Sequence, residues 1–246
     1  MINTDQTLEQ LIQLKLHGMA QVYSTTRALP SHEGPTAHEL LAMMVEAEQH
    51  SRTGLRTQMY LKFSGLRYDA VLENIQCSPT RNLERSQLIA LADCSFIQRA
   101  ENILITGSTG CGKSYLACAL GRQACTMGYK TLYLGMNRFT EKLSLSKLDG
   151  SYIKLLNLIE KFPLLILDDF GLTPMENQVR IALLQMLEDR YGKRATIITS
   201  QLPVSKWHQY ISEPTLADAI MDRLSGSAHR FELKGESLRR KSFEKK

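Results

Sequence analysis

The chain has 246 residues, of which 43% are hydrophobic and 22% charged, and its formal net charge is +5 at pH 7. This composition is ordinary for a globular protein with a sizeable core. The sequence contains neither the run of about 18 apolar residues that a membrane span requires nor a signal peptide, so we expect a cytoplasmic protein without membrane contact. The mild positive charge suits a nucleic-acid partner without requiring one.

The first part of the chain has the pattern of a small helical domain. Residues 7–23 and 37–49 place apolar side chains at three- and four-residue spacing, which predicts two amphipathic helices. Residues 29–36 lie between them and contain two prolines and a glycine, which break a helix. We therefore expect an all-α N-terminal domain over residues 1–68 that binds DNA or a partner.

A basic stretch closes this domain. Residues 50–68 contain no acidic side chain, and they combine positive charge with the aromatic rings of Tyr60, Phe63 and Tyr68. One interpretation is a surface that faces nucleic acid. The other is an amphipathic helix whose aromatic side chains belong to the core. The basic residues in question are Arg52, Arg56, Lys62 and Arg67.

The rest of the chain predicts an α/β domain. Residues 69–100 are a linker and a lead-in helix, the helical part being residues 84–100. From residue 101 onward, short apolar runs alternate with amphipathic helical segments, which indicates a parallel sheet covered on both faces. The expected strands are residues 102–107, 130–135, 163–169 and 195–201.

A glycine-rich loop follows the first of these strands and precedes a helix, which is the context of a Walker A motif. Its backbone N–H groups would converge on phosphates at the helix N-terminus. Lys113 would reach the β- and γ-phosphates of ATP, and the Ser114 hydroxyl would bind Mg²⁺. The predicted nucleotide-binding residues are Gly107, Ser108, Thr109, Gly110, Cys111, Gly112, Lys113, Ser114 and Tyr115.

Polar side chains at two other strand ends complete the predicted site. Asp168 and Asp169 end an otherwise apolar strand, and a buried carboxylate needs a cation or donors to offset its desolvation. We expect Asp168 to hold Mg²⁺ and Asp169 to orient or deprotonate the attacking water. Thr199, Ser200 or Gln201 would sense the γ-phosphate or position water, because parallel sheets bind ligands beyond the carboxyl ends of their strands.

Together these motifs resemble those of AAA+ ATPases, and the chain is more narrowly similar to the IstB-like helpers of insertion-sequence transposases, relatives of the DnaC-like helicase loaders. The strings that carry the resemblance span nearly the whole chain. They are LKLHGMAQ, FIQRAENILITGSTGCGKSYLA, LLILDDFG, ITSQLPVSKWHQYI, PTLADAIMDRL and AHRFELKGESLRRK.

The resemblance implies an AAA+ ATPase domain at residues 101–246 and further roles within it. Arg223 matches an arginine finger, which would complete the catalytic site of a neighbouring subunit. Arg239 or Arg240 matches the sensor 2 position. The expected catalytic set is then Lys113, Asp169, Gln201 and Arg223, acting on ATP with Mg²⁺.

The expected function is an ATP-dependent homo-oligomer that grips double-stranded DNA, largely independently of sequence, and assists a transposase in choosing its target. Arg138 and Lys142 are added to the candidate DNA contacts. Two alternatives stay open. One is a helicase loader acting in DNA replication, and the other is a P-loop kinase for a small molecule, which would need a lid with arginines and no finger from another subunit.

Overall fold

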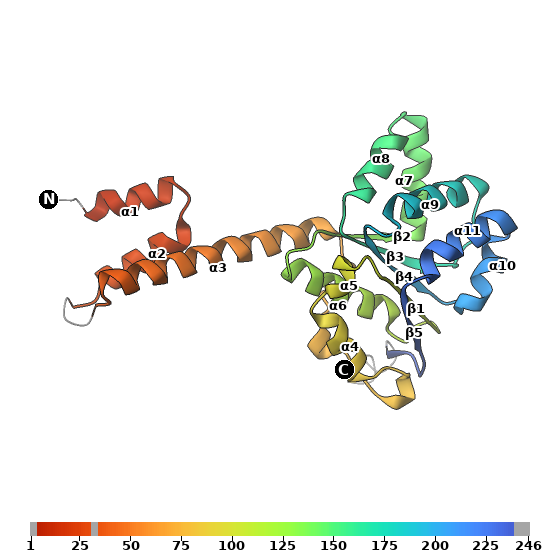
Figure 1. Cartoon of the computed structure of the whole chain (residues 1–246), viewed down its shortest axis with the longest axis horizontal. Helices are drawn as coiled ribbons and strands as arrows, with labels where there is room; N and C mark the ends of the chain where they lie inside the picture. The colour runs from red at the N-terminus through yellow and green to blue at the C-terminus, as the bar shows by residue number, and fades with distance from the viewer. Residues whose placement is uncertain (1–3, 31–33, 239–246) are drawn as a thin grey trace. The chain divides into compact units, whose positions relative to one another are not determined.

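The computed structural model describes residues 4–30 and 34–238, whose contacts divide the chain into two compact units, residues 1–59 and residues 60–246 (Figure 1). The first unit contains α1 (Thr4–Gln13), α2 (His17–Arg27) and most of α3 (Ala37–Ser64), which continues into the second unit. With 28 residues, α3 is the longest described helix, yet neither it nor any other described helix has the apolar length that crossing a membrane requires.

Close packing between α2 and α3 depends on Gly18. A Cβ atom at this position would lie 2.3 Å from the carbonyl oxygen of Ala47 on α3. The buried carboxylate of Glu48 accepts hydrogen bonds from the Gly18 and Met19 backbone nitrogens, at 2.9 and 3.4 Å. Glu48 thus satisfies N–H groups in the first turn of α2 that have no intrahelical partner.

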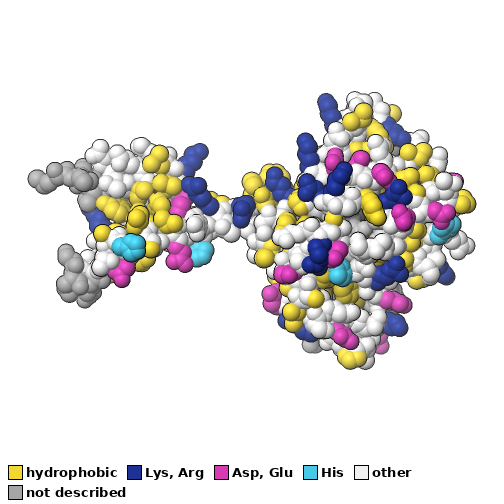
Figure 2. All heavy atoms as spheres, in the orientation of Figure 1, with side chains coloured by type: hydrophobic (Ala, Val, Ile, Leu, Met, Phe, Trp, Pro, Cys, Tyr) yellow, Lys and Arg dark blue, Asp and Glu magenta, His cyan; other side chains and the backbone are white. Residues whose placement is uncertain are grey.

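Apolar side chains remain exposed on the first unit, and Figure 2 shows them as yellow spheres on its surface. A unit this small buries only part of its apolar area. The exposed apolar side chains of this unit include Ile12, Leu14, Leu41, Met43, Val45 and Leu55.

The second unit is built on a parallel five-stranded sheet in the order β2-β3-β4-β1-β5. Because β4 lies between β1 and β3, the carboxyl ends of these three strands meet at one edge of the sheet. The strands are β1 (Asn102–Gly107), β2 (Thr131–Gly135), β3 (Leu164–Phe170), β4 (Ala195–Ser200) and β5 (Ala228–Leu233).

Helices cover both faces of this sheet (Figure 1). One face packs against α4 (Arg85–Ala92), α5 (Ser95–Gln98) and α6 (Lys113–Thr126). The other packs against α7 (Met136–Leu148), α8 (Tyr152–Glu160), α9 (Asn177–Arg190), α10 (Trp207–Ile211) and α11 (Pro214–Ser225). Short 3-10 turns are η1 (Leu72–Asn74), η2 (Pro79–Arg81) and η3 (Val204–Lys206).

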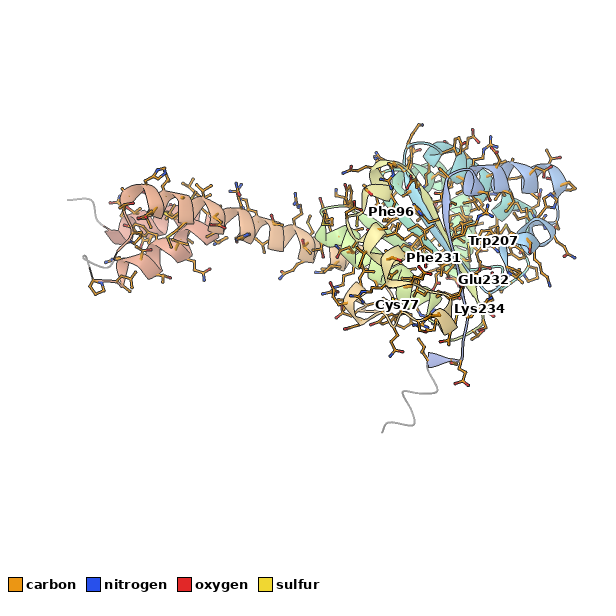
Figure 3. All side chains as sticks on the ribbon, turned by 60° about the horizontal axis from the view of Figure 1, so that its bottom comes forward. Cys77, Phe96, Trp207, Phe231, Glu232 and Lys234 are labelled. Carbon is orange, nitrogen blue, oxygen red and sulfur yellow. The ribbon has the colours of Figure 1, made fainter. Side chains whose placement is uncertain are left out.

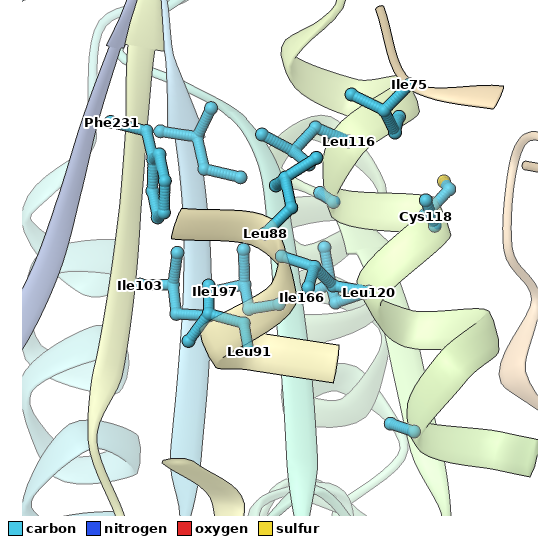
Figure 4. Close-up of a cluster of buried hydrophobic side chains, with 14 of the residues drawn as sticks. Ile75, Leu88, Leu91, Ile103, Leu116, Cys118, Leu120, Ile166, Ile197 and Phe231 are labelled. Atoms are coloured by element: carbon cyan, nitrogen blue, oxygen red, sulfur yellow. The ribbon is translucent and has the colours of Figure 1, made fainter. Parts of the chain in front are cut away.

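The sheet separates two hydrophobic cores, one on each of its faces. On β1, Ile103 and Ile105 enter one core and Leu104 enters the other, because successive side chains point to opposite faces. Phe96 and Phe231 belong to the first core and Trp207 to the second (Figure 3). In the first core, side chains of the sheet meet those of α4 and α6 (Figure 4), among them Ile166, Ile197, Leu88, Leu91, Leu116 and Leu120.

The predicted α/β class is confirmed, with differences in detail. The helical stretch expected over residues 84–100 is two helices, because Cys94 adopts a left-handed conformation with φ 57°. Strand β5 was not predicted. It is an outer strand of the sheet, and its polar and apolar residues alternate instead of forming a continuous apolar run. The contacts divide the chain at residue 59 rather than 68, and the expected linker over residues 69–100 contributes Ala70, Ile75 and Leu83 to the first core.

Candidate nucleotide-binding site

The glycine-rich loop connects β1 to α6 at the sheet edge where β1, β3 and β4 end. Gly107 has φ 143°, and a Cβ atom there would lie 2.2 Å from the Leu233 carbonyl oxygen of β5. Gly112 has φ 95° and immediately precedes α6, which begins at Lys113. The free N–H groups at this helix N-terminus favour an anion such as phosphate.

Two predicted side chains lie on this loop or in contact with it. Lys113, whose residue exposure is only 6%, donates to the Ser108 carbonyl oxygen at 2.8 Å. Gln201, just after β4, accepts from the Thr109 hydroxyl at 2.8 Å. The fold thus brings the predicted lysine and the predicted water-positioning amide to the same loop, although 88 residues separate them in sequence.

Asp168 is fully buried at the end of β3 and is surrounded by hydroxyl donors. It accepts hydrogen bonds from Ser114, at 2.8 Å, and from Thr199 and Tyr133. Burial is the main cause that raises the pKa of Tyr133, with a further contribution from Asp168, so its phenol stays protonated and donates. These donors, with Arg67 at 3.7 Å, offset the desolvation of the carboxylate.

The residues present fit a magnesium ion. The Ser114 hydroxyl and the Asp168 carboxylate lie within hydrogen-bond distance of each other beside the phosphate loop. Both supply oxygen donors, and Mg²⁺ in nucleotide sites is held by one or two such groups together with phosphate oxygens and water. The structure therefore brings together the two residues predicted to hold the metal.

The side chains of Asp169 and Asp168 have different surroundings. Its φ of 62° lies in the left-handed region, and the β3–β4 register shifts between Leu167 and Phe170. The Asp169 backbone nitrogen donates to the Thr199 hydroxyl at 3.2 Å, while its carboxylate stays partly exposed and lines a cavity. This local irregularity places one carboxylate in the core and the next one where a nucleotide would bind.

A cavity of about 740 Å³ adjoins the loop, a size typical of ligand pockets. Its lining includes the predicted Thr109, Lys113 and Asp169, together with residues that the sequence analysis did not assign to the site. Arg81, for example, donates to the Cys111 carbonyl oxygen at 2.8 Å. No recognisable motif marks these residues, because they come from the irregular segment after α3; they are Tyr68, Asn74, Ile75, Gln76, Arg81 and Leu83.

The candidate DNA contacts have different surroundings. All of these side chains except Arg67 are exposed at the surface without lining the cavity, and Arg52 also pairs with Glu48 at 2.7 Å; the others are Arg56 and Lys62 on α3 and Arg138 and Lys142 on α7. Arg67 lies 3.5 Å from Asp169 and lines the cavity. Arg67 therefore lies beside the candidate nucleotide site, and its contact with DNA stays a prediction.

Arg223 lies far from its own phosphate loop. Its carbonyl oxygen accepts from the Asn102 side chain at 3.0 Å, and Asn102 begins β1 whereas Gly107 ends it. The strand separates these ends by about 17 Å. The guanidinium pairs with Glu188 at 2.6 Å and with Asp222 at 3.5 Å. Arg239 and Arg240 lie outside the described residues.

Sequence comparisons match nearly the whole chain to known proteins. Residues 9–246 match the family model described as IstB-like ATP binding protein. An insertion sequence ATP-binding protein of Sinorhizobium fredii, y4pL, is 44% identical over 95% of this chain and 96% of its own length. The ATP-binding protein of insertion sequence IS1162 from Pseudomonas fluorescens is 40% identical over 82% of this chain and 88% of its own.

Solved structures share the fold at low sequence identity. AMPPCP-bound DnaA from Aquifex aeolicus has a TM-score of 0.59 at 21% identity, covering 74% of this chain and 55% of DnaA. DnaI has a TM-score of 0.57 at 21% identity, covering 68% of this chain and 92% of DnaI. These likenesses establish that the chain shares the α/β fold of these structures.

Proposed function

Because the chain belongs to the family of IstB-like ATP binding proteins, we propose that it is a magnesium-dependent ATPase that assembles on DNA and assists an insertion-sequence transposase in selecting its target. The observation that carries the ATPase assignment is the pair formed by Ser114 and Asp168, 2.8 Å apart beside the phosphate loop. The descriptions of the relatives as insertion-sequence proteins support the link to transposition.

Each side chain of the site has a role in the proposed reaction. Lys113 binds the β- and γ-phosphates, and Ser114 and Asp168 hold Mg²⁺, which neutralises phosphate charge when bound. Asp169 faces the cavity and orients or deprotonates the attacking water, with Gln201 beside Thr109 as a second positioning group. The apolar side chains of Ile75 and Leu83 in the cavity wall suit the adenine base.

Arg223 supports a reaction that needs a second copy of the chain. At about 17 Å along β1 from its own loop, it does not reach the phosphates bound there. In the proposed assembly its guanidinium leaves Glu188 and Asp222 for the phosphates of a neighbouring copy, which requires a head-to-tail interface. We propose that ATP clamps neighbouring copies together and that hydrolysis releases them.

DNA binding in this proposal comes from basic side chains repeated around the assembly. Arg56, Lys62, Arg138 and Lys142 are exposed and available to neutralise phosphates. The exposed apolar side chains of the first unit support a separate contact with the transposase, because such surfaces often mark protein interfaces.

Assembly on random-sequence duplex DNA tests the proposal. Light scattering is measured with ATP, with ADP and without nucleotide for the native chain, Lys113→Ala, Arg223→Ala and the control Arg122→Ala, which removes a half-buried arginine paired with Asp69. We expect ATP-dependent assembly of the native and control chains and its loss in the other two. A native chain that consumes ATP on DNA while remaining monomeric would contradict the clamp and favour the small-molecule kinase.

A further inference from the structure

The short segment that follows α3 packs on α6, the helix that starts at the phosphate loop. Leu66 contacts Gly121 of α6 so closely that a Cβ atom at Gly121 would lie 2.9 Å from the leucine Cδ2. The ring of Tyr68 lies 6.1 Å, centre to centre, from that of Tyr115, which also belongs to α6. Arg67 is thus held between two residues that pack on α6, and one of them, Tyr68, also lines the cavity beside the phosphate loop.

The Arg67 guanidinium faces both carboxylates at the end of β3. Its Nη1 atom lies 3.5 Å from Asp169 Oδ2 and 3.7 Å from Asp168 Oδ2, and its Cζ lies 5.5 Å from the centre of the Tyr68 ring. Its pKa is raised, with the Tyr133 hydroxyl as the largest cause. The side chain is 48% exposed, so it is able to reorient without disturbing the core.

Arg67 also shares its cavity with Lys113, which binds phosphate in the proposed function, and with Gln201, which positions the attacking water there. The lining of this cavity includes Thr109, Lys113 and Gln201 as well as Arg67. Two neighbouring carboxylates attract a guanidinium when no other cation is near them. Once Mg²⁺ supplies that charge, a triphosphate in the same cavity is the stronger partner, since arginine forms short, charge-assisted hydrogen bonds with phosphate oxygens.

We propose that Arg67 is an arginine of the ATP site that acts within its own subunit. It pairs with Asp168 and Asp169 when the site holds no nucleotide, and it contacts the terminal phosphate of a bound nucleoside triphosphate. Arg67 thereby distinguishes ATP from ADP. This inference rests on the proposed ATPase function and adds to it a residue that the motifs do not include.

Two other roles for Arg67 make different predictions. A DNA contact, which the basic stretch over residues 50–68 suggested, would affect DNA affinity without affecting nucleotide preference. A purely structural ion pair would affect the thermal stability of the chain and leave both affinities unchanged.

The test compares affinities for ADP and for an ATP analogue with a methylene group between the β- and γ-phosphates. Isothermal titration calorimetry with Mg²⁺ is applied to the native chain, Arg67→Gln, Arg67→Lys and the control Arg122→Gln. Arg122 lies on α6 and pairs with Asp69. Removing one charged phosphate contact should reduce the preference for the analogue over ADP about tenfold. We expect this in Arg67→Gln, partial recovery in Arg67→Lys and the native ratio in the control.

An unchanged ratio in Arg67→Gln overturns the inference, whether the variant loses DNA affinity or thermal stability. The proposed function fails in a distinguishable way: the native chain then binds neither nucleotide, or Lys113→Ala binds the analogue as tightly as the native chain does. If the native chain prefers the analogue and the Arg67→Gln variant keeps this preference, only the proposed role of Arg67 is refuted.

Discussion

Asp168 is a carboxylate without solvent exposure, and its surroundings explain how the fold tolerates it. Hydroxyl groups from α6, β2 and β4 donate to it, so elements that are far apart in sequence satisfy one side chain. A buried polar group that keeps its partners costs little, whereas one that loses them destabilises the fold. The same oxygens are suited to Mg²⁺, which links local stability to the proposed chemistry.

Asp168→Asn should separate these two effects. The amide has the same shape without the charge, so we expect nucleotide affinity in the presence of Mg²⁺ to fall about tenfold or more. The melting temperature without nucleotide should change little, because the hydroxyl groups retain a polar partner. Calorimetric titrations with and without Mg²⁺ check this. Asp149→Asn, at an exposed turn, is the control, and a variant that keeps the full magnesium effect would refute the metal role of Asp168.

Glu101 links the start of β1 to β5. It pairs with Arg99 at 2.7 Å and with His229 of β5 at 2.9 Å, and Arg99 is the main cause that lowers the pKa of Glu101 to about 2. Because this pKa is below its ordinary value of 4.5, the folded state favours the charged form. The resulting stabilisation is complete above pH 4.5 and is lost as the pH falls toward 2.

Glu101→Gln should therefore destabilise the chain near neutral pH and have a smaller effect in acid. Urea unfolding of the native chain and the variant, at several pH values between about 2 and 6, measures the difference in unfolding free energy. Glu232→Gln, an exposed position on β5, is the control. A difference that stays constant across this range would show that the ion pairs do not cause the effect.

At the scale of elements, the α2–α3 contact depends on the absence of a Cβ atom at Gly18. Gly18 lets the two helix backbones approach, and Glu48 of α3 caps the first turn of α2 across this contact. A glycine inside a helix is otherwise less favourable than alanine by about 1 kcal/mol. The close approach therefore explains the glycine in the LKLHGMAQ string.

Gly18→Ala should destabilise the first unit by about 1–3 kcal/mol, because the new Cβ would lie 2.3 Å from the Ala47 carbonyl oxygen. Gly54→Ala is the matched control: it lies on α3 with no atom within 4 Å of its Cβ position, and it should stabilise α3 slightly. Hydrogen exchange of the α2 and α3 amides measures both changes. Equal protection in the two variants would contradict the packing argument.

At the scale of the whole molecule, the proposed role of Arg223 divides one catalytic site between two copies of the chain. The arginine lies at the end of the sheet where β1 begins, and the phosphate loop lies where β1 ends. If hydrolysis requires the arginine finger of a neighbouring copy, a single copy of the chain is inactive. The proposed activity is therefore a property of the assembly.

Mixing two inactive variants tests this division. Lys113→Ala lacks a working phosphate loop and Arg223→Ala lacks the finger, so each alone should lose ATPase activity about a hundredfold or more. When they are mixed, some interfaces combine a native loop with a native Arg223, and we expect activity to reappear up to about a quarter of the native value for random mixing. Phosphate release from equal mixtures measures it. Activity no higher than that of the separate variants would refute action between subunits.

The order of amino acids by itself determined the sheet, its covering helices and the phosphate loop. These features are local: apolar strands alternate with helices, and the eight residues Gly107–Ser114 hold the loop's glycines, Lys113 and Ser114. Strand β5 could not be predicted in this way, because polar and apolar residues alternate along Ala228–Leu233 and the continuous apolar run of the other strands is missing.

Only the tertiary structure decided which distant side chains meet at the site. Arg67, Arg81 and Tyr133 carry no motif, and they reach the loop or the Asp168 carboxylate because separate segments pack on α6 and the sheet edge. The same holds for the left-handed backbone of Asp169, which a regular strand pattern does not predict. Contacts between residues far apart in sequence depend on packing and burial, and these arise only when the whole unit has folded.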